Sequence, residues 1–283
     1  MQYCFYGKSD RGKKRKKNED FILDRAIGKE ERLFIISDGM GGHRSGHIAS
    51  KLASTTFADQ YQQQRTDHIP VPEALQSALN KANVRVFNQS SENRLNSGMG
   101  TTLSVLVVKR NEGSIIHVGD SRIYQIRDSR ITRMTQDHTL VAKLLEEGHI
   151  SPQEAQKHPR KNILYQSVGI DQKIKPHRRT RFPIQSGDIY VLCSDGLSNM
   201  VDEETIRSVA DTHYPKEAVL KLIRKANKNG GNDNISVQVI KFAGHESFEQ
   251  TEELSRGPVP KIYLLFLMLT LLVILYFLAG FTR

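Results

Sequence analysis

The sequence has few of the residues that would place the protein in an oxidising compartment. Only two cysteines occur in 283 residues, Cys4 and Cys193, and two cannot form a disulfide framework. Residues 2–17 are polar and contain no apolar core, so they do not predict a secretory signal. Cys193 ends an apolar run that begins at residue 189, which predicts a buried cysteine. We therefore expect the main part of the chain to lie in a reducing cytoplasm.

Tryptophan is absent and aromatic residues make up only 7% of the chain, although the charge is strongly positive. Lys and Arg outnumber Asp and Glu by 41 to 31, which gives a formal net charge of +10. A surplus of this size is found in nucleic-acid-binding proteins. Here the basic residues are scattered and no DNA-binding motif occurs, so we predict no nucleic-acid partner. A hydrophobic share of 38% excludes both global disorder and a polytopic membrane protein.

The C-terminal end contains the only long apolar run. Residues 262–280 are apolar except for Thr270 and Gly280, and they predict a single transmembrane helix because 19 residues span about 28 Å. Residues 244–261 form an acidic linker rich in Pro and Gly, so that the first 243 residues carry +11. The positive charge before the span predicts a single-pass protein of the cell inner membrane, with its folded domain facing the cytoplasm.

Short apolar runs and two pairs of amphipathic helices alternate along residues 1–243. The short links Asn111-Glu-Gly113 and Gly119-Asp120 between the runs favour antiparallel hairpins, and the helices indicate sheets covered by helices without a βαβ repeat. Helices are expected at 45–64, after Pro72, at 202–211 and at 216–228. Strands are expected at 32–37, 102–108, 114–118, 123–127, within 177–194 and at 235–242.

Four aspartates stand where a predicted strand meets a glycine-containing turn: Asp38, Asp120, Asp195 and Asp233. A single Asp-Gly pair indicates only a turn. Four such carboxylates at strand ends would repel one another unless cations neutralise them. All-oxygen ligation favours Mg²⁺ or Mn²⁺, and no Cys or His cluster offers a zinc site.

Five segments carry a family pattern in a fixed order. They are Arg15-Lys-Lys-Asn-Glu19-Asp20, Ser37-Asp38-Gly39-Met40-Gly41-Gly42-His43, Val118-Gly119-Asp120-Ser121-Arg122, Ser194-Asp195-Gly196-Leu197 and Gly231-Asn232-Asp233-Asn234-Ile235. Over residues 3–242 the series resembles the metal-dependent protein phosphatases of the PPM (type 2C) family, particularly the bacterial members. The resemblance implies an α+β fold, a four-layer α-β-β-α sandwich of two mainly antiparallel sheets.

The resemblance also implies a metal centre with two Mn²⁺ or Mg²⁺ ions and a third, weaker metal. Asp38 would bridge the two ions, and Glu19 and the carbonyl of Gly39 would hold one of them. Asp195 and Asp233 would hold the other. Asp120 would bind the third metal together with Asp195, and Asp20 matches a position beside the ligands.

By the same resemblance, Arg15 binds the substrate phosphate and a metal-bridging hydroxide attacks phosphorus directly. A guanidinium can hold two phosphate oxygens, which suits Arg15 to this role. Its neighbours Lys13, Lys14, Lys16 and Lys17 fit either a solvated loop or an electrostatic guide for phosphorylated partners.

One position departs from the eukaryotic relatives, in which a histidine after the bridging Asp-Gly is thought to protonate the leaving group. Met40 occupies this place and cannot donate a proton, and His43 is a poor candidate, so the general acid has no assignment. Residues 137–169 resemble the flap segment of bacterial relatives, either as a gate or as a packed insertion. Within the flap, His138 and His158 fit structural better than catalytic roles.

Three functions are compatible with the basic, carboxylate-containing domain at residues 1–243. The first is a membrane-tethered phosphoserine/phosphothreonine protein phosphatase that opposes a Ser/Thr kinase. The second is a binding module that recognises phosphoproteins without turnover, and the intact set Glu19, Asp38, Asp195 and Asp233 counts against it. The third, nucleic-acid binding, lacks a motif.

Overall fold

The computed structural model describes residues 2–92, 96–160 and 162–243. Contacts divide the chain into two units, Met1–Phe242 and Ala243–Arg283. The predicted linker at 244–261 and the predicted span at 262–280 lie outside the described residues. Within the described ranges, no helix is both long and apolar enough to cross a membrane.

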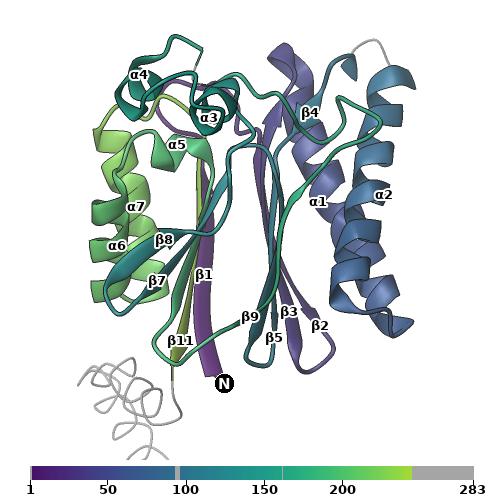
Figure 1. Cartoon of the computed structure of the whole chain (residues 1–283), viewed down its shortest axis with the longest axis vertical. Helices are drawn as coiled ribbons and strands as arrows, with labels where there is room; N and C mark the ends of the chain where they lie inside the picture. Colours follow the sequence, from purple (N-terminus) through teal and green to yellow (C-terminus); the bar gives the residue numbers. More distant parts are fainter. Residues whose placement is uncertain (1, 93–95, 161, 244–283) are drawn as a thin grey trace, which may run out of the picture. The chain divides into compact units, whose positions relative to one another are not determined.

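Two sheets form the centre of the first unit (Figure 1). The first sheet has the strand order β1-β11-β10-β7-β8. Its strands are β1 (Gln2–Asp10), β11 (Ile235–Ala243), β10 (Ile189–Cys193), β7 (Arg122–Arg127) and β8 (Arg130–Arg133). β10 pairs antiparallel with both β11 and β7, and β7 pairs antiparallel with β8.

The second sheet has the order β2-β3-β5-β6-β9, with β4 added beside β3. Its strands are β2 (Asp20–Ile27), β3 (Glu31–Met40), β5 (Leu103–Lys109), β6 (Glu112–Val118), β9 (His177–Pro183) and β4 (Gly100–Thr101). Every pair in this sheet is antiparallel. The hairpin predicted at Asn111-Glu-Gly113 is therefore confirmed, because it joins β5 to β6. The hairpin predicted at Gly119-Asp120 was wrong, because this link leads from β6 in the second sheet to β7 in the first.

Helices cover the outer faces of both sheets, so the predicted four-layer α+β sandwich is confirmed (Figure 1). The second sheet is covered by α1 (Gly42–Thr66) and α2 (Val71–Glu92), and the first by α5 (Asp195–Ser198), α6 (Glu203–Thr212) and α7 (Pro215–Lys228). One apolar core lies under each helical layer, and a third core between the sheets contains Phe34, Tyr190 and Phe242. Cys193 is fully buried, as predicted.

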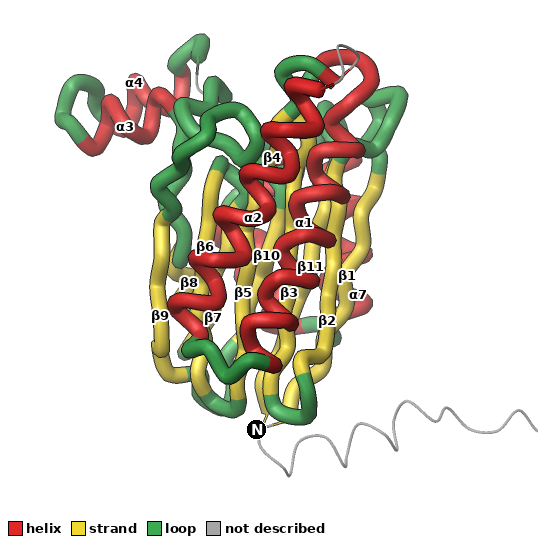
Figure 2. The backbone as a smooth tube through the Cα atoms, turned by 90° about the vertical axis from the view of Figure 1, so that its right-hand side faces the viewer, coloured by secondary structure: helices red, strands yellow, loops and turns green. Residues whose placement is uncertain are grey.

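The flap adds α3 (Leu140–Glu146) and α4 (Pro152–Lys157), which project beyond the layers in Figure 2. Each helix begins at a side-chain cap. Thr139 accepts a hydrogen bond from the amide of Ala142, and Ser151 forms a capping box with Glu154. The segment therefore has defined local structure of its own.

One expectation about the elements was wrong, and one strand was missed. The first long helix begins at Gly42 and not at Ser45, because Gly41 adopts a φ of 142° and brings the chain against Met99, where a Cβ would lie 2.7 Å from the Met99 Cα. The sequence reasoning also missed β1, an edge strand within the polar N-terminal segment whose side chains are mostly half-buried. Tyr3 and Phe5 pack into the core between the sheets.

Candidate metal centre

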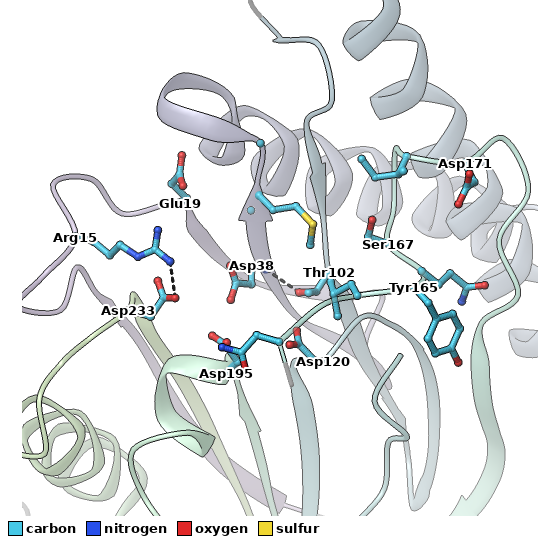
Figure 3. Close-up of a pocket in the computed structure, with 17 residues that line it drawn as sticks. Arg15, Glu19, Asp38, Thr102, Asp120, Tyr165, Ser167, Asp171, Asp195 and Asp233 are labelled. Atoms are coloured by element: carbon cyan, nitrogen blue, oxygen red, sulfur yellow. Dashed lines mark hydrogen bonds and ion pairs between the residues drawn. The ribbon is translucent and has the colours of Figure 1, made fainter. Parts of the chain in front are cut away.

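A cavity of about 600 Å³ lies where the loops of both sheets meet, and the predicted carboxylates line it (Figure 3). The side chains come from the start or end of β2, β3, β6, β10 and β11, which are rigid positions for ligands. Seven of the eight residues predicted for the site line this cavity: Arg15, Glu19, Asp38, Gly39, Asp120, Asp195 and Asp233.

Asp38 is fixed at the end of β3 by the neighbouring strand. Its amide donates to Thr102 Oγ1 at 2.8 Å, and its carbonyl accepts from the Thr102 amide at 2.9 Å and from Thr101 Oγ1 at 2.9 Å. Three hydrogen bonds to the main chain leave the carboxylate free to face the cavity, as Figure 3 shows. The structure therefore places Asp38 at the centre of the carboxylates.

Glu19 lies beside the Asp38-Gly39 turn because the main chains are joined. The Gly39 amide and the Ser50 hydroxyl both donate to the Glu19 carbonyl, at 3.2 and 2.6 Å. Gly46 in α1 lies against both groups. A Cβ on Gly46 would approach the Gly39 carbonyl oxygen to 2.7 Å and the Glu19 carboxyl carbon to 2.8 Å. The sequence reasoning missed Gly46, and its only signal was a glycine inside a helical pattern.

Asn234 is a second residue whose role sequence reasoning missed. Its side chain is almost fully buried and accepts from the Glu19 amide at 2.8 Å. It also donates to the carbonyls of Arg11 and Lys17, at 2.8 and 2.9 Å. One amide therefore fixes both ends of the loop that carries Arg15. An Asn directly before a strand was the available signal.

Arg15 reaches the cavity from this loop and forms an ion pair of 2.7 Å with Asp233. Half of its side chain is exposed, so the guanidinium can meet a ligand from solvent. The hydrogen bond that Arg15 donates to Asp233, with the charges of Asp233, Asp38 and Glu19, raises the pKa of Arg15 above its ordinary value. The neighbouring lysines 13, 14, 16 and 17 are exposed, as a solvated loop requires.

Asp20 does not line the cavity but lies behind it. The Ser194 hydroxyl donates to its carboxylate at 2.7 Å, and Asp20 pairs in register with Asp38 across β2 and β3. Burial raises the pKa of Asp20 to about 7, against hydrogen bonds from Ser236 and Ser194. Asp20 therefore lies next to Asp38 on the neighbouring strand, behind the residues that line the cavity.

The carboxylates that face the cavity repel one another. Burial and then the charges of Asp20 and Asp195 raise the pKa of Asp38 well above its ordinary value. Burial, followed by the charges of Asp195 and Asp137, raises the pKa of Asp120 to about 8. Burial and then the charge of Asp233 raise the pKa of Asp195. The cluster is thus short of positive charge in spite of Arg15.

This donor set fits divalent cations. Asp195 Oδ1 is buried and has no hydrogen-bond partner in the described part of the chain. Carboxylates with raised pKa values and a nearby carbonyl are the hard oxygen donors that Mg²⁺ and Mn²⁺ prefer. No three His, Cys, Asp or Glu side chains of the described residues stand ready to enclose one ion by themselves. The Gly39 carbonyl and water would therefore complete the coordination of the ions.

Met40 lines the cavity. It occupies the position at which the eukaryotic relatives have a histidine. The side chain of His43 lies outside the described residues. His138 is buried and stacks on His117 with ring centroids 5.3 Å apart, and His158 accepts from the Arg160 amide at 3.1 Å. Neither His138 nor His158 lines the cavity, so their structural interpretation is supported.

The comparisons with known proteins agree with this geometry. The model of the protein phosphatase 2C family matches residues 7–226. Protein phosphatase PhpP of Streptococcus pneumoniae is 38% identical over 234 residues, which cover 82% of this chain and 94% of PhpP. The serine/threonine phosphatase of S. agalactiae superposes with a TM-score of 0.79 at 30% identity, covering 85% of this chain and all of that one.

A further solved structure is the catalytic domain of the serine/threonine protein phosphatase PstP in complex with two manganese ions. It superposes with a TM-score of 0.74 at 33% identity and covers 86% of this chain and 99% of that one. The family model spans most of the folded unit, and these relatives match nearly all of their own length. The chain therefore belongs to the protein phosphatase 2C family, the PPM-type Ser/Thr phosphatases.

Proposed function

We propose that this chain hydrolyses phosphoserine and phosphothreonine in proteins, with two Mn²⁺ or Mg²⁺ ions held in the carboxylate cavity. One observation carries the proposal: Arg15 and the five predicted carboxylates, which come from both sheets, meet in one open cavity. Asp38 would bridge the ions, with Glu19 and the Gly39 carbonyl on one side and Asp195 and Asp233 on the other. A third, weaker metal would lie near Asp120. The cations, when bound, supply an activated water for direct attack on phosphorus.

The chain's own residues position the substrate. Arg15 would bind two oxygens of the phosphate, and its ion pair with Asp233 holds the guanidinium at the mouth of the cavity. Asn234 fixes the Arg15 loop relative to Glu19, so that phosphate and ligands keep one geometry. Met40 has no proton to give. We propose that solvent, which reaches the open cavity, protonates the leaving alkoxide.

Metal-dependent turnover is the direct test. The full chain should release phosphate from a phosphothreonine peptide with Mn²⁺ and not after chelation. Asp38→Asn and Asp195→Asn should each lower kcat/KM by about a hundredfold or more, because each removes a ligand charge. The exposed Asp67→Asn is the matched control. Full turnover in both ligand variants, or turnover that does not depend on metal, would support a different function for the cavity.

We also propose that residues 262–280 anchor the enzyme in the inner membrane, with residues 1–243 in the cytoplasm and a Ser/Thr kinase acting on the same phosphoproteins. The long apolar run without a charged residue and the basic folded unit support this proposal. Deletion of residues 258–283 should move the activity from the membrane fraction to the soluble fraction. A truncated protein that still sediments with membranes would refute the anchor.

A further inference from the structure

One wall of the cavity differs in chemistry from the rest. Leu164, Tyr165 and Ile170, which we call the flap wall, line the same cavity as the carboxylates. Figure 3 shows Tyr165 on the side of the cavity away from Arg15 and Asp233. The cavity thus has a charged region, where phosphate would bind, and an apolar region formed by the flap wall, which has no role in binding phosphate or metal.

Two side chains of the flap wall are unusually exposed for their type. Tyr165 is 46% and Ile170 is 42% exposed. In the described part of the chain six large apolar side chains are at least 39% exposed, and four of them belong to residues 145–170. Exposed apolar side chains that gather beside a polar cavity mark a binding surface more often than a chance arrangement.

Tyr165 is held by the buried histidine pair. Its amide donates to the His138 carbonyl at 2.9 Å, and its ring lies 5.5 Å from the His138 ring. His138 in turn accepts from the Gly119 amide at 3.1 Å, next to Asp120. The Lys143 ammonium lies 5.9 Å from the centroid of the Tyr165 ring. The ring is therefore attached to the same turn that carries a predicted ligand.

Ile170 is held by a different buried side chain. Asn83 in α2 is 1% exposed, accepts from the Gly169 amide at 2.8 Å and donates to the carbonyls of Asp171 and Gln172. The Ile170 side chain lies over Gly100 of β4, where a Cβ would approach it to 2.9 Å. Both exposed side chains thus have fixed supports, and the wall is formed before a ligand arrives.

The residues next to the phosphorylated one in a peptide substrate lie close enough to contact the flap wall. An extended chain advances about 3.3 Å per residue, so residues one or two positions from the phosphorylated one lie about 3 to 7 Å away. A cavity of about 600 Å³ also has room for more than a phosphate group. Asp171, which lines the cavity next to Ile170, disfavours an acidic side chain there.

We propose that the flap wall is a specificity subsite for a bulky apolar side chain within two residues of the phosphorylated Ser or Thr. The inference rests on the proposed phosphatase function and adds the class of substrate sequence to it. The occupant is the segment of the phosphoprotein that flanks the phosphorylated residue. Tyr165 and Ile170 are the residues that would contact it.

The test compares matched phosphothreonine nonapeptides with the full chain and Mn²⁺. Each of the four positions within two residues of the phosphothreonine carries either Leu or Gln, which have similar length and no charge. At one position at least, kcat/KM should favour Leu about fivefold, as expected for partial burial of an apolar side chain. In Tyr165→Ser and Ile170→Ser, this ratio should fall to about one.

The ratio is taken within each variant, so it does not depend on how much active protein the variant yields. Tyr214→Ser is the matched control, because Tyr214 is 57% exposed and does not line the cavity, and its ratio should stay near fivefold. Ratios below about twofold at all four positions, or a preference that persists in both flap-wall variants, would overturn the subsite. Failure to hydrolyse any peptide would instead refute the phosphatase function.

Discussion

Replacing Asp120 by asparagine should stabilise the metal-free protein at alkaline pH, although the same change removes a predicted metal ligand. Burial and the charges of Asp195 and Asp137 raise the pKa of Asp120 to about 8 from an ordinary value of 3.8. Between about pH 4 and pH 8, the metal-free native state therefore keeps a proton on Asp120, whereas the unfolded chain has lost it. A cluster that is built for cations is costly to ionise without them.

The sign and size follow from proton linkage. A carboxyl whose pKa is raised on folding contributes its full stability below about pH 4 and loses it as the pH rises through about 8. Without screening, this loss for Asp120 is about 4 kcal/mol between pH 5 and pH 8, at 1.36 kcal/mol per pKa unit. Water in the open cavity and proton sharing with Asp195 reduce it, so we expect about 2 kcal/mol.

Urea unfolding of the full chain in a chelator, followed by circular dichroism because the chain has no tryptophan, measures this difference. The free energy of unfolding of Asp120→Asn minus that of the unchanged protein should rise by about 2 kcal/mol from pH 5 to pH 8. Exposed Asp67→Asn should show no such rise. Saturating Mn²⁺ should stabilise the unchanged protein more than Asp120→Asn. A difference that is flat with pH would refute the electrostatic reasoning.

Three further predictions concern residues around the cavity. Gly46→Ala should raise the Mn²⁺ concentration for half-maximal activity at least about tenfold without loss of fold by circular dichroism, because its Cβ would displace Glu19; unchanged metal activation would contradict this. Burial lowers the pKa of His117 to about 3, so below pH 6.5 the unfolded chain binds a proton at this histidine and the native state does not. The unchanged protein therefore loses stability as the pH falls, and the difference in unfolding free energy between it and His117→Gln should shrink by about 2 kcal/mol from pH 7.5 to pH 5 in urea unfolding. A difference that stays constant with pH would contradict a buried neutral His117. Asn83→Ala should cost about 2 kcal/mol in urea unfolding and weaken the preference for Leu over Gln in peptide assays; retention of both would show that Asn83 does not support Ile170.

The metal side of the cavity could be predicted from the sequence because each ligand has a local signal. Asp38 and Asp195 each stand one serine beyond an apolar run, in β3 and after β10, and strand ends fix side-chain direction. The same local reasoning failed for β1, since an edge strand with half-buried side chains has little apolar contrast. It also failed for Gly46, whose role depends on the approach of Glu19 from another element.

The flap wall shows why the other half of the cavity could not be predicted. Ile170 owes its position to Asn83, which is 87 residues earlier in the chain, and Tyr165 owes its position to His138 and through it to Gly119. Neither support leaves a periodic or motif signal, because each is one polar side chain bonded to distant main-chain groups. The two halves therefore differ in what a substitution changes. A change at a strand end alters the charge that holds metal, whereas a change at Asn83 moves only the apolar wall. Substrate preference in this fold can accordingly vary while the metal centre stays the same.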